Sequence, residues 1–193
     1  NKTIEDYSDS DIWSGNIRSF DSNIRGFSGW KNFDDFFDFI NTSSEYIVLR
    51  NYKNFESMDS DFSDIDFLTS DRDFMYSVNG VKKHNGTNRA AYSIRVGDNS
   101  CNIDIRLVDD RYYDSNWAKN MLSNKVMFQG KFFIPDCLNE FYSLLYHALI
   151  HKNTLIDKYN ERLLKLSLEL GFNFEPSVFR NREKSISILN KFL

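Results

Sequence analysis

Apolar residues recur at two different spacings along this 193-residue chain, and the spacing changes near residue 136. Before that point, short apolar runs alternate with polar loops, which is typical of strands joined by turns. After it, apolar residues recur every three or four positions, which is typical of helices that pack by one face. The pattern predicts a small mixed β-sheet followed by a helical region, an α+β arrangement.

The predicted elements are as follows. In NFDDFFDFINTS, Phe33, Phe36 and Phe37 share one side of a helix that we expect over 33–40. Strands are expected at EYIVLRNY (45–52) and SDIDFLTS (63–70), with hairpins at 90–110 and 125–135 that turn at Gly97-Asp98-Asn99 and at Gln129-Gly130. Further helices are expected at 72–80, 113–122, 136–152, 153–171 and 182–193, with Asp71 and Gly171 as caps.

These elements divide the chain into three parts. Residues 1–30 show no sustained period and are expected to be irregular. Residues 31–135 are expected to form the α/β core, and residues 136–193 a helical region packed on that core. A chain of this length fits one domain with a helical appendage. Because it opens on Asn1 rather than Met, we expect it to be a domain excised from a longer protein.

Composition narrows the class of protein. Apolar residues make up 41% and aromatic residues 16%, which is enough for a packed core. The net charge of −4 gives no global electrostatic reason to bind duplex nucleic acid, since such binding neutralises phosphates with Lys and Arg. Cys101 and Cys137 form no CxxC motif, which favours a reducing cytoplasm. No apolar run is long enough to span a bilayer.

Two aspartates on the second predicted strand are the strongest chemical signal. Asp64 and Asp66 lie two residues apart, so in a strand both side chains point to one face. Like charges this close repel unless a cation lies between them, and Mg²⁺ prefers such oxygen ligands. Asp104, between two isoleucines on a later predicted strand, would supply a third carboxylate. Because Asp is common here, a solvent-facing strand is the alternative explanation.

The run YIVLRNYKNFESMDSDFSDIDFLTSD, followed by CNIDIRLVDD, resembles the active-site region of the nucleotidyltransferase superfamily that has the polymerase-beta palm. The resemblance covers residues 46–108 and implies a small mixed sheet of nucleotidyltransferase type. It also implies that Asp64, Asp66 and Asp104 are the catalytic residues and bind Mg²⁺ (or Mn²⁺), and that a nucleoside triphosphate or other nucleotide-activated molecule is the substrate.

The sequence departs from the superfamily in the phosphate-binding turn. The Gly-Ser or Gly-Gly pair that usually follows the first strand is replaced here by LRNYKNF. Arg50 and Lys53 are therefore candidates for binding phosphate in its place. Arg106, His151 and Lys152 are further candidates for contacting a substrate phosphate, although an ion pair with the acidic residues is the alternative for Arg106.

Two segments, one with a pair of histidines and one rich in aromatic residues, each allow two interpretations. His147 and His151 stand one helical turn apart, which is the spacing of a zinc pair, but no third ligand is evident and we favour a structural or substrate-facing role. The segment RYYDSNW, directly after the Asp104 strand, would supply either core packing or an aromatic ring for stacking on a substrate.

The leading hypothesis is a metal-dependent nucleotidyltransferase or related phosphotransferase that acts on a hydroxyl acceptor, including a glycan or sugar-phosphate intermediate. The alternatives are a non-catalytic module that binds a nucleotide or partner, a toxin-like nucleotidyltransferase acting on tRNA or protein, and a helical interaction domain whose acidic strand is incidental. From carboxylate repulsion alone, Asp66→Asn is expected to leave stability unchanged or slightly improved.

Overall fold

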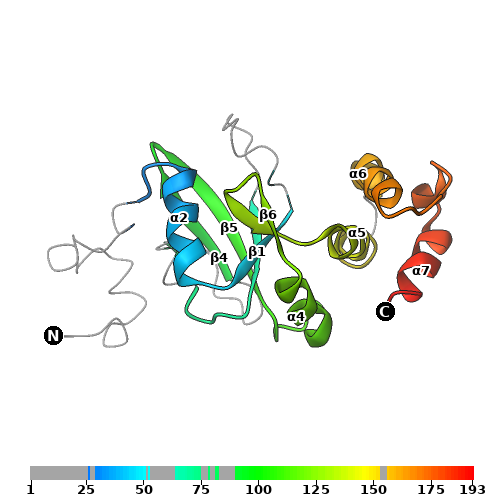
Figure 1. Cartoon of the computed structure of the whole chain (residues 1–193), viewed down its shortest axis with the longest axis horizontal. Coiled ribbons are helices and arrows are strands. Elements are labelled where there is room, and N and C mark those ends of the chain that lie inside the picture. The colour runs from blue at the N-terminus through cyan, green and yellow to red at the C-terminus, as the bar shows by residue number, and fades with distance from the viewer. Residues whose placement is uncertain are drawn as a thin grey trace, which may run out of the picture.

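The structure is a computed structural model that describes residues 26, 29–50, 52, 64–74, 78, 81–82, 90–152 and 156–193. Most of the segment 1–30 and most of the helix expected at 72–80 lie outside these residues. Within them the fold is α+β, as the sequence pattern predicts, with one small mixed sheet and a helical second part (Figure 1).

The sheet has five strands in the order β1-β2-β5-β4-β3. Pairing is antiparallel between β1 and β2, parallel between β2 and β5, and antiparallel between β5, β4 and β3. The strands are β1 (Tyr46–Arg50), β2 (Ile65–Thr69), β3 (Val81–Lys82), β4 (Ala90–Val96) and β5 (Asn99–Leu107), and a separate hairpin consists of β6 (Val126–Phe128) and β7 (Phe132–Ile134). Both hairpins predicted from the sequence are therefore present.

The helices begin and end close to the predicted positions. Those described are α2 (Phe33–Ser43), α4 (Ser115–Ser123), α5 (Cys137–Tyr146), α6 (Ile156–Glu169) and α7 (Arg182–Asn190), with a π-helix η3 (His147–Lys152) and a 3-10 turn η4 (Val178–Arg180). Asn32, Asp114 and Asp136 cap α2, α4 and α5 with side-chain oxygens that accept backbone N–H bonds. None of the described helices is long and apolar enough to cross a membrane.

Gly171 ends α6 as expected. Its φ of 74° lies in the left-handed region, its N–H donates to the Leu168 carbonyl, and the Phe172 N–H donates to the Ser167 carbonyl. These two bonds form a Schellman motif, for which glycine is the usual residue because it has no Cβ.

One face of the sheet packs against α2. Its core is strongly aromatic: Phe36, Phe37 and Tyr46 are almost fully buried and contact one another or Phe67 edge-on or stacked. Trp30 closes one end of this core through a parallel bridge to Val96. This apolar layer fixes the strands from one side.

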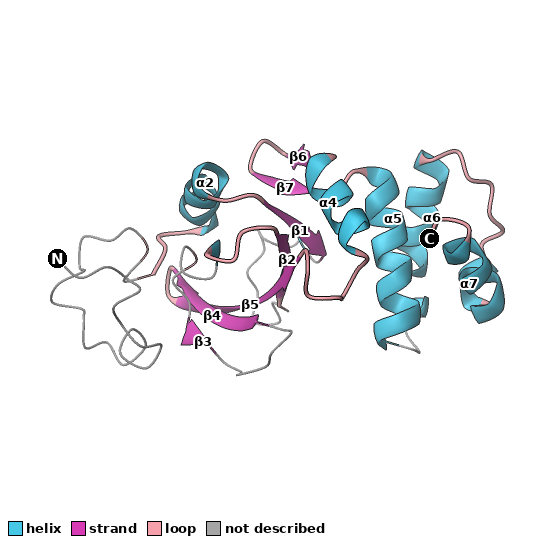
Figure 2. Cartoon of the chain, turned by 90° about the horizontal axis from the view of Figure 1, so that it is seen from below, coloured by secondary structure: helices cyan, strands magenta, loops and turns pink. Residues whose placement is uncertain are grey.

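The opposite face packs against the helical region. Ile47, Leu49 and Leu68 from β1 and β2 share a core with α4, α5, α6 and α7. Figure 2 shows these helices gathered beyond the β1 side of the sheet, while α2 lies over the sheet itself. The helices therefore adjoin β1 and β2, and β2 carries Asp66.

Candidate functional site

Asp66 and Asp104 lie side by side on the helical face of the sheet. They are register partners in the parallel strands β2 and β5, and neighbouring strands are about 4.8 Å apart. Ile65 and Ile103, the residues that precede them, pack in the core under α2, so the two carboxylates leave the sheet on the other face. The Asp104 residue is buried and the Asp66 side chain is 16% exposed.

Asp64 lies one residue before β2 and is half-buried. Within the described ranges, no three His, Cys, Asp or Glu side chains are grouped so that they could hold a metal ion. The structure thus brings two of the three predicted ligands into register. These two carboxylates on adjacent strands provide the hard oxygen donors that suit a divalent ion such as Mg²⁺.

A β-bulge places Arg50 beside this acidic pair. Val48 pairs with Phe67 and Arg50 pairs with Asp66, so Leu49 is an extra residue on β1. By strict alternation Arg50 would point toward α2 with Val48, but the extra residue turns it to the helical face. Arg50 is buried there. The bulge that turns its side chain to this face has no signal in the spacing of apolar residues along the sequence.

Arg50 forms a bidentate ion pair with Asp66. Its Nη2 lies 2.8 Å from Asp66 Oδ1 and its Nε lies 3.2 Å from Asp66 Oδ2. Nη1 donates to the Tyr113 hydroxyl at 3.5 Å. Burial by itself would lower the pKa of Arg50, but the Asp66 carboxylate and the neighbouring tyrosines raise it above its ordinary value. In this structure the guanidinium provides the positive charge that the acidic pair requires.

This ion pair changes one expectation drawn from the sequence. Carboxylate repulsion suggests that Asp66→Asn would be harmless to stability, but the structure shows that Asp66 neutralises a buried guanidinium. Removing one member of a buried pair leaves an uncompensated charge, which is strongly destabilising. We therefore expect Asp66→Asn to destabilise the fold.

Arg106 lies two residues after Asp104 and on the same face of β5. Its Nη1 lies 3.5 Å from Asp110 Oδ2, and its guanidinium carbon lies 4.0 Å from the centre of the Tyr112 ring. Asp110 also accepts the Tyr112 N–H at 2.8 Å. Arg111, with a φ of 65°, turns the chain between them. This loop therefore folds back so that Tyr112 covers Arg106.

Tyr112 connects the sheet to the π-helical turn. Its hydroxyl lies 2.7 Å from His147 Nδ1, and its ring stacks on His151 with 3.9 Å between centroids. His147 is buried and His151 is exposed. A π-helix replaces the α-helix expected here, and π-turns are frequent at functional sites. The two histidine rings lie 6.1 Å apart, and in the structure both contact Tyr112.

Burial and basic neighbours lower the pKa values of both histidines. Burial lowers the pKa of His147 to about 2, and Arg50, Lys152, His151 and Arg106 act in the same direction. Burial also lowers the pKa of His151, again with the help of Arg106, Arg50 and Lys152. The Tyr112 hydroxyl and His147 Nδ1 share one hydrogen bond, whose direction depends on the tautomer of the imidazole. The π-helical turn is therefore a region of converging positive charge.

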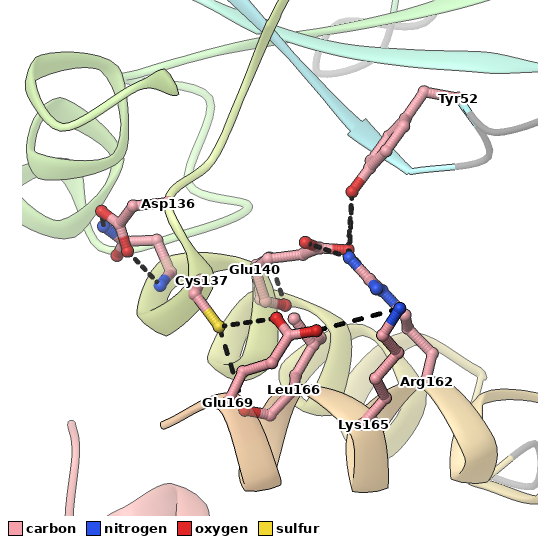
Figure 3. Close-up of polar contacts among 10 residues, drawn as sticks. Tyr52, Asp136, Cys137, Glu140, Arg162, Lys165, Leu166 and Glu169 are labelled. Atoms are coloured by element: carbon pink, nitrogen blue, oxygen red, sulfur yellow. Dashed lines mark hydrogen bonds and ion pairs between the residues drawn. The ribbon is translucent and has the colours of Figure 1, made fainter. Parts of the chain in front are cut away.

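A second polar network joins the end of β1 to the helices (Figure 3). The Tyr52 hydroxyl donates to Glu140 Oε1 at 2.8 Å, and Arg162 Nη2 lies 2.6 Å from each Glu140 carboxylate oxygen. Glu140 is buried on α5, Arg162 lies on α6, and Tyr52 follows Arg50 by two residues. This network holds the segment after β1 against the helical region and so helps to position Arg50.

The thiol of Cys137 lies at the edge of this network, where it contacts Glu169 and the Leu166 carbonyl (Figure 3). Burial and the Glu169 carboxylate raise the pKa of this thiol to about 11. The thiol is therefore protonated at neutral pH, and a protonated thiol is a poor nucleophile.

The structure gathers most of the residues singled out in the sequence. Asp66, Asp104 and Arg50 form one group, while Arg106 and His151 both contact the Tyr112 ring and Lys152 follows His151 in η3. Lys53 lies outside the described residues. The sequence analysis missed the contact of Tyr112 with His147 and the contacts of Glu140 with Tyr52 and Arg162. The paired residues are 35, 88 and 22 positions apart, respectively, so no local pattern in the sequence indicates them.

In the comparisons with known proteins, no family model, no curated protein and no solved structure matches the chain.

Proposed function

We propose that the chain is a divalent-metal-dependent nucleotidyltransferase or a related phosphotransferase, which transfers a nucleotidyl or phosphoryl group to a hydroxyl acceptor. The observation that carries this proposal is the register pairing of Asp66 with Asp104 on one face of the sheet. Two carboxylates that share a partly buried site need a positive charge nearby, which Arg50 supplies in this structure and a divalent ion would supply when it is bound. The strand order also supports the superfamily resemblance, because β2, at the Asp-x-Asp pair, lies between β1 and β5, the strand of the third carboxylate.

Each residue of the site has a role in this proposal. Asp66 and Asp104 would hold the ion, and the superfamily resemblance adds Asp64, which precedes β2, as a third ligand. When bound, a divalent ion neutralises charge on the transferred phosphoryl group and lowers the pKa of a bound hydroxyl. Asp104 is the buried carboxylate of the group and would take the proton of the acceptor hydroxyl at a carboxylate oxygen. Arg50 would bind non-bridging phosphate oxygens through its two-pronged guanidinium.

Arg50 has two possible partners in this scheme, because it already contacts both oxygens of Asp66. A divalent ion on Asp66 competes with the guanidinium for the same oxygens. Arg50→Met should therefore raise the affinity for Mg²⁺ while it lowers the affinity for a triphosphate. This opposite response distinguishes a phosphate-binding arginine from a purely structural one.

The same ion pair favours a second candidate function, a non-catalytic module that binds a nucleotide or partner. If Arg50 permanently replaces the metal ion, the site is structural and the fold serves only for binding. Such a module would bind triphosphate equally well with Mg²⁺ or with a chelator.

The test combines binding with turnover. Calorimetry with each nucleoside triphosphate, with Mg²⁺ and with a chelator, should show metal-dependent binding. An α-labelled triphosphate should label the acceptor if the nucleotidyl group is transferred, and a γ-labelled one if the phosphoryl group is transferred. Asp104→Asn should abolish the transfer, while Asp98→Asn, in the exposed β4–β5 turn, should not. Equal triphosphate binding with and without Mg²⁺, and no labelled product from any triphosphate, would favour the binding module.

A further inference from the structure

Three planar groups form a stacked column beside the acidic pair. The guanidinium carbon of Arg106 lies 4.0 Å from the centre of the Tyr112 ring, and the His151 ring lies 3.9 Å from the same centre at an interplanar angle of 8°. Two groups this close to one ring centre cannot share a face of that ring, so Arg106 and His151 cover opposite faces of Tyr112. The order along the column is therefore Arg106, Tyr112 and His151.

His151 is the outer layer of this column. Tyr112 covers one face of its imidazole, yet the residue is exposed, so the exposure is at the other face and at the ring edges. The other rings that contact it, Tyr146 and His147, lie further away, with centroids at 5.5 Å and 6.1 Å. The free face of the column therefore belongs to His151.

The segment RYYDSNW, which precedes α5 in the chain, supplies packing and not an exposed ring. Tyr112, Tyr113 and Trp117 are all buried, with at most 7% of each residue exposed. Tyr112 has a group on each face, and Tyr113 and Trp117 contact each other edge-on. A ligand can thus reach the ring of His151 but not those of this segment.

The ring beneath His151 is held in position. The Tyr112 hydroxyl lies 2.7 Å from His147 Nδ1, and the Tyr112 N–H donates to Asp110, which also contacts Arg106. Burial lowers the pKa of His151, which favours the uncharged imidazole at neutral pH. A flat ring on a fixed support is suited to stacking on a nucleobase, because every base has a π-face.

The column lies close to Arg50, the residue to which we assign the triphosphate. Arg50 Nη1 donates to the Tyr113 hydroxyl at 3.5 Å, and the Tyr113 ring contacts the Tyr112 ring edge-on with 4.7 Å between centroids. Tyr112 in turn stacks on His151. Arg50 and the exposed imidazole are thus joined by two neighbouring tyrosines.

We propose that the exposed face of His151 stacks on the base of the nucleoside triphosphate whose phosphates bind Arg50. The inference rests on the proposed function, because that function supplies the nucleotide. It deepens the function by assigning a base-binding subsite. Stacking does not read the hydrogen-bonding edge of a base, so this subsite is expected to accept all four bases.

The test compares triphosphates that carry a base with one that does not. Calorimetry of the whole chain in Mg²⁺ is carried out with ATP, GTP, CTP and UTP, and with tripolyphosphate, which lacks the base and the ribose. His151→Ala should weaken binding of the nucleoside triphosphates about tenfold, the usual size of the loss of one base stack. The same change should leave the affinity for tripolyphosphate as in the wild type.

Two further variants control this comparison. His151→Phe keeps a flat ring and removes both nitrogen atoms, so it should bind the nucleoside triphosphates within about twofold of the wild type. Leu168→Ala, which truncates a 70% exposed side chain on α6, should bind every ligand as the wild type does. Weaker tripolyphosphate binding by both His151→Ala and His151→Phe would show that His151 binds phosphate, and would overturn the base site.

Proton NMR locates the contact directly. The ring signals of His151, assigned by comparison with His151→Phe, should move upfield with ATP, because the ring current of a stacked base shields the protons over its face. Tripolyphosphate should cause no such shift.

The outcomes separate this inference from the proposed function. Equal affinity of His151→Ala and the wild type for all four nucleoside triphosphates, or no upfield shift with any of them, would overturn the base site even if the chain transfers a nucleotidyl group. Binding that depends on His151 but is equal with Mg²⁺ and with a chelator would support the base site and contradict the transferase.

Discussion

The two faces of the central sheet are built from the same strands but have opposite chemistry. Toward α2, the buried side chains are apolar and largely aromatic, with Phe67 of β2 and Tyr46 of β1 among them. Toward the helical region, the apolar core is interrupted by Arg50, Asp66 and Asp104, which come from three adjacent strands. Because successive side chains of a strand point to opposite faces, neighbouring residues of one strand lie in different environments.

This difference separates what stabilises the fold from what we propose to be functional. Burying aromatic rings against α2 contributes free energy through apolar area and ring contacts. Burying a guanidinium and two carboxylates costs free energy, which pairing only partly recovers. Hydrophobic residues of similar size would often stabilise the fold as well or better. The charges on the helical face are therefore better explained by function than by stability.

The largest effect on stability is expected on the apolar face. Phe67→Ala should lower the free energy of unfolding by about 3–5 kcal/mol, because Phe67 is fully buried and contacts Phe36, Tyr46 and Phe74. Urea denaturation followed by fluorescence measures this loss, and Phe67→Leu should lose much less. A cost below 1 kcal/mol for Phe67→Ala would mean that this face is not the main core.

On the charged face, Asp66→Asn should cost about 2–4 kcal/mol, because the Arg50 guanidinium loses its partner. The double substitution Arg50→Met with Asp66→Leu should cost less than the sum of the single changes. A double-mutant cycle by urea denaturation measures this coupling. Additive losses would show that Arg50 and Asp66 do not interact in solution.

A substitution at the junction of the sheet with the helical region should lower the free energy of unfolding somewhat less. Glu140→Gln should cost about 2–3 kcal/mol, because Glu140 is buried while Arg162, its partner, is partly exposed. Lys165→Gln on the same helix α6 removes only an exposed pair with Glu169 and should change stability by less than about 0.5 kcal/mol. Thermal and urea unfolding of both variants make the comparison, and equal losses would contradict it.

The smallest predicted effect depends on pH. The pKa of His147 is lowered to about 2 in the folded state, whereas in the unfolded chain it is about 6.5. Its contribution to stability is therefore complete above pH 6.5 and is lost as the pH falls. The reason is that His147 binds a proton in the unfolded chain at a pH at which it stays unprotonated in the folded chain. Between pH 7 and pH 5 this amounts to about 2 kcal/mol.

His147→Gln removes this proton uptake, so its free energy of unfolding should vary less with pH than that of the wild type. Urea denaturation of both proteins at pH 7 and pH 5 makes the measurement. His151→Gln serves as the control at an exposed position, where a smaller change is expected. Parallel pH profiles for the wild type and His147→Gln would show that His147 is not buried as the structure places it.

Much of the fold could be predicted from local pattern. The helix at α2, both hairpins and the helical second part follow from the spacing of apolar residues, and the cap at Gly171 follows from residue type. The shared face of Asp66 and Asp104 follows from alternation once both segments are recognised as strands. These features depend on neighbours in the sequence, which is why the pattern contains them.

What could not be predicted depends on contacts between distant residues. The bulge at Leu49 turns Arg50 to the acidic face, and no period within β1 signals it. Its pairing with Asp66 therefore reverses the stability expectation for Asp66→Asn. Likewise, the π-turn that begins at His147 contacts Tyr112, which lies 35 residues earlier in the chain.

The central claim is that Asp66 and Asp104 together hold a divalent ion. Calorimetric titration of the whole chain with Mn²⁺ tests it without requiring a substrate. The wild type should bind Mn²⁺, Asp66→Asn and Asp104→Asn should each lose at least about tenfold in affinity, and Asp98→Asn should bind as the wild type does. Absence of Mn²⁺ binding by the wild type, or equal affinity in Asp104→Asn and Asp98→Asn, would contradict the account.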